Sequence, residues 1–114
     1  MARSATSVKL DPAVTRFAQR LSEDIDATAV LLFGSHARGT NGPDSAYDFI
    51  IVSEQFIGVD PFERGLGLKL LFYEVGEPAP MHLHCLTPEE FEIGKNRISM
   101  LAEVLPEAID LLDA

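Results

Sequence analysis

The sequence predicts an α/β or α+β domain, in which helices pack against a small sheet. Short apolar runs typical of buried strands alternate with segments whose apolar residues recur at helical spacing. Asp-Pro and Thr-Pro pairs mark helix starts, and stretches containing Gly and Pro separate the elements. Strands that alternate with helices form layered domains. The length of 114 residues is typical of one domain, so we expect a single domain over residues 1–114.

The first helix is predicted over residues 11–25. Asp11 is a good N-cap and Pro12 suits the first helical position. The apolar face of this helix consists of Val14, Phe17, Ala18 and Leu21. An apolar run over residues 27–33 then predicts a buried strand that ends at Gly34.

The middle of the chain predicts a short helix over residues 35–38, a loop, and a second buried strand over residues 47–52. Asp60-Pro61 repeats the helix-start signal, and we expect this helix to reach about Tyr73. Glycines weaken its first turns, so a strand over residues 68–73 is the alternative.

The last part of the chain predicts a strand followed by helical segments. The strand covers residues 81–86, and Thr87 with Glu90 forms a capping box for the next helix. Residues 98–112 are apolar at helical spacing, but Pro106 must break that helix. The residues after the break fit either a helix or an edge strand.

Length, composition and net charge make some classes of protein less expected than others. The 114 residues, 46% of them hydrophobic, suffice for a buried core, and no apolar run approaches the ~18 residues that span a bilayer. A lone Cys85 fits the reducing cytoplasm, where we expect the protein, and the N-terminus lacks the apolar core of a signal peptide. The net charge of −9 disfavours non-specific binding to nucleic acid or to anionic membranes, and leaves a homo-oligomer open.

The turn between the first two predicted strands and the acid after it form the candidate site. Gly34 allows a close backbone approach, and a helix that opens at Ser35 presents free N–H groups to an anion. Arg38 adds a cation suited to phosphate. Asp48 stands at the mouth of a buried strand, where a metal ligand explains an acid. Alternatively, Ser35 is only a helix cap and Asp48 a solvated or Arg38-paired acid.

The spacing of these residues resembles a family signature. Gly34-Ser35, ten residues, and then Ala46-Tyr47-Asp48 is similar to the Gly-Ser, ten residues, Asp, any residue, Asp of the minimal nucleotidyltransferases in the DNA polymerase beta superfamily. The intervening residues agree with that family at Ala37, Arg38, Gly39, Pro43, Asp44 and Ser45. The resemblance implies a polymerase beta palm-like fold, a small mixed sheet flanked by helices.

The resemblance also implies a chemistry. The family's strand acids and a third acid on a neighbouring strand hold Mg²⁺, and a nucleoside monophosphate passes from a nucleoside triphosphate to a hydroxyl. On this chain it implies Gly34 and Ser35 as phosphate binders, with Arg38 and Ser45 in support, and Asp48 as a metal ligand. The implied reaction is transfer of AMP from ATP to a protein or small molecule (AMPylation). Small members are often antitoxins of HEPN ribonuclease toxins, which makes a HEPN-type protein the first candidate partner.

Two departures from the signature put catalysis in doubt. Ala46 replaces the first acid, and a methyl group cannot bind Mg²⁺, which takes oxygen ligands. The third acid would fall at His82 or His84, more readily at His82, and imidazole suits transition metals better than Mg²⁺. The two histidines alternate on one face of the predicted strand, so they are either ligands, with Asp48, or polar residues on a solvent face.

Two explanations stay open for an inactive chain. Either Ala46 is an engineered replacement of Asp, or the lineage has lost catalysis and keeps the fold as a non-catalytic module that binds nucleotide or a partner. The genomic codon at position 46 separates them.

Overall fold

The protein was analysed as a computed structural model that describes residues 3–4, 10–97 and 99–112. Its centre is a five-stranded sheet in the order β1-β5-β2-β3-β4. The strands are β1 (Arg3–Ser4), β2 (Ala29–Phe33), β3 (Tyr47–Val52), β4 (Met81–Leu86) and β5 (Ile109–Asp110). β2 runs antiparallel to β3 and β5, whereas β3–β4 and β1–β5 are parallel pairs. The predicted mixed sheet flanked by helices is confirmed.

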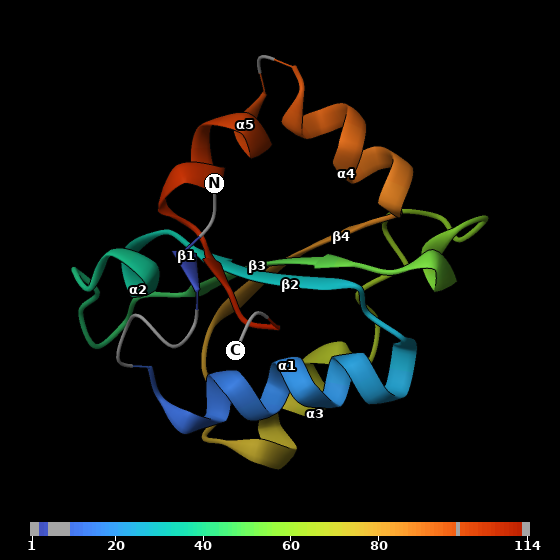
Figure 1. Ribbon diagram of the computed structural model, residues 1–114. Coiled ribbons are helices and arrows are strands. Elements are labelled where there is room, and N and C mark those ends of the chain that lie inside the picture. Colours follow the sequence, from blue (N-terminus) through green and yellow to red (C-terminus); the bar gives the residue numbers. More distant parts are fainter. Residues whose placement is uncertain (1–2, 5–9, 98, 113–114) are drawn as a thin grey trace.

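Helices cover both faces of this sheet (Figure 1). α1 (Pro12–Ile25) and α3 (Leu68–Val75) lie on one face, and α4 (Pro88–Lys95) and α5 (Met100–Val104) lie on the other. The short α2 (Ser35–Arg38) follows β2 at one end of the sheet. The 3-10 turns η2 (Glu54–Phe56) and η3 (Leu105–Glu107) complete the regular structure of the described residues.

The α1 face holds the larger core. Asp11 caps α1 by accepting a hydrogen bond from the Ala13 N–H at 2.9 Å, as its sequence predicts. Phe17 packs edge-on against Phe49 of β3 and Phe72 of α3, with ring centroids 5.1 and 5.3 Å apart. These aromatic contacts fix α1 and α3 on the sheet.

The face of the sheet that α4 and α5 cover buries fewer side chains than the α1 face, and it is called the thin face below. α4 has no buried residue, although its predicted capping box is present between Thr87 and Glu90. Cavities of about 250 and 330 Å³ lie between the two helices and the sheet. The smaller core on this face includes Ile50 and Val52, which alternate along β3 with the residues of the larger core.

The predicted helix from Asp60 is wrong in its first half, and the alternative strand is wrong throughout. Residues 61–67 form turns, because the Asp60 carboxylate accepts a hydrogen bond from the Phe62 N–H at 2.9 Å and closes a local turn. Gly67, at φ 82°, then sets the start of α3 one residue later.

The C-terminal prediction is confirmed in part. Pro106 lies in η3 and ends the helical segment, and β5 follows it. β5 is not an edge strand, because it pairs with β1 on one side and β2 on the other. β1 has only two residues and no period for the sequence to reveal, and Ile98 lies outside the described residues.

Candidate functional site

One end of the sheet brings the predicted site residues together. Phe33, the last residue of β2, stands opposite Asp48 in the antiparallel pair, and Asp48 stands opposite His82 in the parallel pair. The Gly34 turn, Asp48 and His82 are therefore neighbours, although they are far apart in the sequence.

The Gly34 turn fits closely around the Asp48 carboxylate. Gly34 has φ 77° and ψ −157°, a conformation that side chains disfavour. A Cβ on Gly34 would lie 2.5 Å from Asp48 Oδ2. A glycine is therefore required here both by the backbone and by the carboxylate that packs on it.

The turn leads directly into α2. The Gly34 carbonyl accepts hydrogen bonds from the N–H groups of Ala37 and Arg38, each at 3.0 Å. The first N–H groups of a helix have no partner within it and can bind an anion. The predicted short helix at Ser35 is thus confirmed, and the role of Ser35 in phosphate binding stays a prediction.

Asp48 forms a pair with His82. Its Oδ1 lies 3.0 Å from His82 Nδ1, and the two side chains are 24% and 70% exposed. The Nε2 edge of the imidazole is left for solvent or a ligand, while the carboxylate is shared between the histidine and the Gly34 turn.

The donor set does not fit the two-magnesium site that the resemblance implies. Ala46 lies two residues before Asp48, directly before β3, and its methyl group offers no oxygen ligand to a metal ion. Asp48 is then the single acid of the signature, and its cross-strand neighbour is a histidine. Within residues 3–4, 10–97 and 99–112, no group of three His, Cys, Asp or Glu residues could hold a metal ion. The transition-metal site of Asp48, His82 and His84 stays a prediction.

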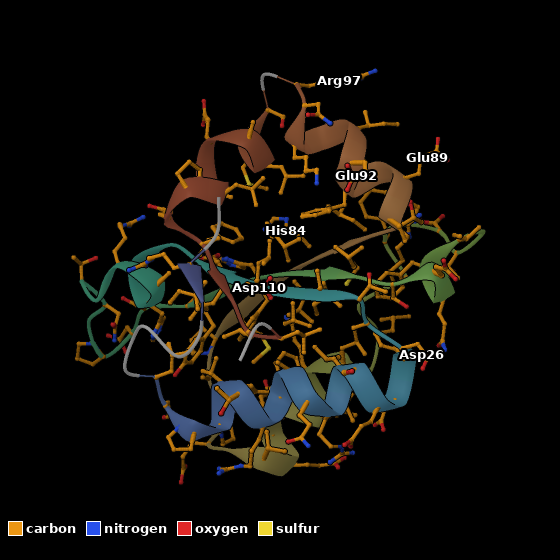
Figure 2. The ribbon with its side chains drawn as sticks, viewed as in Figure 1. Asp26, His84, Glu89, Glu92, Arg97 and Asp110 are labelled. Atoms are coloured by element: carbon orange, nitrogen blue, oxygen red, sulfur yellow. The ribbon has the colours of Figure 1, made fainter. Side chains whose placement is uncertain are left out.

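His84, two residues beyond His82 along β4, is half-buried. Figure 2 shows it between the sheet and the α4–α5 layer, and its ring lies 5.6 Å from that of Phe33. Burial lowers the pKa of His84, and the nearby Asp48 charge opposes this effect in part. Of the two histidines, His82 is exposed, as expected for a solvent face, and His84 is half-buried, while the alternative role of both as metal ligands stays a prediction.

Arg38 and Ser45 are engaged within the fold. Arg38 Nη1 donates to both oxygens of Glu107, at 3.0 and 3.1 Å, in an exposed ion pair. Ser45 Oγ accepts a hydrogen bond from the Gly42 N–H at 2.9 Å and so closes the loop before β3. Their predicted support of a triphosphate would require Arg38 to exchange Glu107 for phosphate, which an exposed pair allows at small cost.

Sequence reasoning missed the stacked pair of His36 and Tyr47 beside this loop. Their rings are 3.8 Å apart at 15°, and His36 Nε2 lies 3.1 Å from the Ser45 carbonyl oxygen. No periodicity links the two positions, because the contact depends on how the loop between them closes.

The described residues contain no helix that is both long and apolar enough to cross a membrane.

Comparison with known proteins gives one family. A family model described as a nucleotidyltransferase domain matches residues 14–105, which include the Gly34 turn, Asp48 and β4. None of the curated proteins matches the chain.

Two solved structures share the fold. One is a candidate nucleotidyltransferase from Sulfolobus solfataricus, with 17% identity, a TM-score of 0.51, and coverage of 71% of this chain and 69% of that chain. The other is BolA1 from Arabidopsis thaliana, with 17% identity, a TM-score of 0.54, and coverage of 71% and 98%. At this identity they show a shared fold alone, and the family model carries the functional inference.

Proposed function

From the premise that this chain belongs to the nucleotidyltransferase domain family, we propose that it binds a nucleoside triphosphate at the Gly34 turn and that Ala46 prevents nucleotidyl transfer. The observation that carries the proposal is the single carboxylate of Asp48, paired with His82 at 3.0 Å and preceded by a methyl group at position 46.

The expected loss follows from metal coordination. Removing even a neighbour of a metal ligand typically costs about 10–100-fold in affinity or activity, so removing a ligand costs at least as much. His82 does not replace the missing acid for Mg²⁺, because imidazole is a poor ligand for that ion. The phosphate-binding half of the site does not depend on position 46, so nucleotide binding should survive.

The ancestral reaction that we propose is Mg²⁺-dependent transfer of AMP from ATP to a hydroxyl group. Small stand-alone members of the minimal nucleotidyltransferases, which this chain resembles, are often antitoxins, so the acceptor that we propose is a HEPN-type toxin protein. In phosphoryl-type transfer the protein contributes mainly positioning and charge neutralisation. A carboxylate restored beside Asp48 is therefore the smallest change that should return activity.

The test compares this chain with Ala46→Asp, using labelled ATP, Mg²⁺ and a co-expressed HEPN-type protein. We expect both forms to bind ATP and only the Asp form to transfer label. The matched control is Ala46→Asp combined with Asp48→Ala, which keeps one acid at the site and should again be inactive. Equal transfer by the unmodified chain and Ala46→Asp would refute the proposed inactivity.

The second candidate is a non-catalytic module that neutralises its partner by contact. It is favoured by the Asp48–His82 pair, because a second ligand position is then lost besides Ala46. This candidate predicts that Ala46→Asp transfers nothing, that both forms bind the partner, and that Mg²⁺ does not change that affinity.

A further inference from the structure

An apolar groove of about 540 Å³ lies beside β4, between the turns of residues 61–67 and the start of α3. Its apolar lining includes Phe62, Leu66, Leu70, Met81, Leu83 and Cys85. The β4 residues among these alternate with His82 and His84, and they pack against the larger core. The groove therefore opens on the α3 side of β4, and at this edge strand it also reaches His82, the partner of Asp48.

The rim of this groove exposes large apolar side chains. Phe62, Leu66 and Leu70 are 94%, 75% and 61% exposed. Single exposed apolar residues are ordinary on protein surfaces, but three along one groove form a contiguous patch of the kind that marks an interaction site. An exposed phenylalanine is also among the side chains that gain most from burial.

The charged residues that line the groove bear on which kind of partner could bind there. The chain carries 18 acidic and 9 basic residues, yet no acid lines the groove. Lys69 and His82 are its basic residues. A basic partner would find no carboxylate among these lining residues to pair with, whereas two copies of this acidic chain can meet over a lining that holds no acid.

The same surface carries both an exposed side chain and a hollow. The protruding Phe62 and the hollow bounded by Leu70 and Leu83 lie on the same surface. A two-fold axis through such a surface places the protrusion of each copy in the hollow of the other. β4 is the last strand in the sheet order, and a second copy over this region would also shield its edge.

We propose that this groove is the docking surface for a second copy of the chain, in a two-fold dimer anchored by Phe62 and Leu66. The proposed anchors Phe62 and Leu66 lie outside the Asp48 site, which meets the groove at His82, so dimerisation can be measured separately from the proposed function.

Sedimentation equilibrium of the full chain over a wide range of concentrations tests the proposal. We expect a dimer, and for Phe62→Ser with Leu66→Ser we expect association about thirtyfold weaker or more, as for loss of central anchors. Both side chains are exposed, so the fold should survive, and circular dichroism with thermal unfolding of the monomer checks this. The matched control is Ile93→Ser with Met100→Ser, which changes residues 42% and 45% exposed on the α4–α5 layer.

The control variant should dimerise like the unmodified chain. The proposal is overturned if the chain stays monomeric at every concentration, even if another protein binds this groove. It is also overturned if the dimer tolerates loss of Phe62 and Leu66, or if both double variants weaken it equally.

Discussion

On one face of the sheet, α1 and α3 bury a continuous aromatic and aliphatic core that includes Phe17, Phe49 and Phe72. On the other face, α4 contributes no buried residue, and cavities remain beneath it and α5. The polar residues of the candidate site belong to this second face, since Asp48 alternates with Phe49 along β3. A well-packed face can hold the strands in register while a thinly covered face leaves room for polar groups and a ligand.

Alanine substitutions of two adjacent isoleucines of β3 test this difference in packing between the two faces most directly. Ile51 belongs to the α1 face and Ile50 to the α4 face, and both are fully buried. We expect Ile51→Ala to lower the free energy of unfolding by about 4 kcal/mol and Ile50→Ala by about 2 kcal/mol. Ile50 already borders the 250 Å³ cavity, so its loss removes fewer close contacts.

Denaturant unfolding of both variants measures these losses. Each variant serves as the control for the other, because residue type, strand and exposure are matched. Equal losses, or a larger loss at Ile50, would contradict the proposed difference in packing between the two faces.

At the candidate site, by contrast, the backbone of Gly34 packs closely against the Asp48 carboxylate. Gly34 and Gly39 both have φ 77°, but only Gly34 lacks room for a Cβ, because Asp48 Oδ2 would lie 2.5 Å away. We expect Gly34→Ala to destabilise the fold by about 2–3 kcal/mol, and Gly39→Ala by about 1 kcal/mol from backbone strain alone.

Thermal unfolding compares the two glycine variants, each with and without Asp48→Ala. Gly34, at ψ −157°, carries more backbone strain than Gly39, at ψ 16°, so the contact with Asp48 is measured by the change that Asp48→Ala causes in each loss. Asp48→Ala should reduce the loss from Gly34→Ala and leave the loss from Gly39→Ala unchanged. An unchanged loss at Gly34 would mean that the carboxylate does not constrain this turn.

The sequence predicted the elements with strong local signals and missed those set by tertiary contacts. β3 and β4 match their predicted bounds because loops that contain Gly and Pro precede both strands, and Ser53 and Thr87 follow them. The turns after Asp60 were missed because a helix cap and a local Asp turn use the same Asp-Pro pair. The Gly34–Asp48 neighbourhood was expected from spacing, but the pairing of Asp48 with His82 required the β3–β4 register. The partial burial of His84 also could not be read from alternation, which does not say what covers a face.

The thin face is held by polar contacts where burial is lacking, and Glu90 is the clearest case. Its carboxylate accepts a hydrogen bond from the Thr87 N–H at 2.8 Å and pairs with Arg64, whose side chain is 6% exposed. Arg64 Nη1 also donates to the Cys85 carbonyl at 3.2 Å, so α4 is tied to β4 through this guanidinium. The hydrogen bond from Arg64, followed by that from Thr87, holds the pKa of Glu90 below its ordinary 4.5.

The lowered pKa of Glu90 leads to the smallest of the predicted effects on stability. Because the folded state binds the Glu90 proton more weakly than the unfolded state, the contribution of Glu90 is complete above pH 4.5 and is lost as pH falls through the lowered pKa. Glu90→Gln should cost less than about 1 kcal/mol near neutral pH, since the carboxylate is partly exposed. The difference from the unmodified chain should shrink on acidification.

Unfolding titrations from neutral pH to below pH 4.5 measure this difference, with Glu89→Gln as the matched control. Figure 2 labels Glu89 on the outer side of α4, next to Glu90 in the sequence. Among the hydrogen bonds of the described residues, none involves the Glu89 side chain, so its variant should follow the unmodified chain throughout. If instead the two variants change with pH in the same way, the Arg64–Glu90 contact does not hold α4 in place. The stability of the thin face would then have to come from the few apolar contacts of α5.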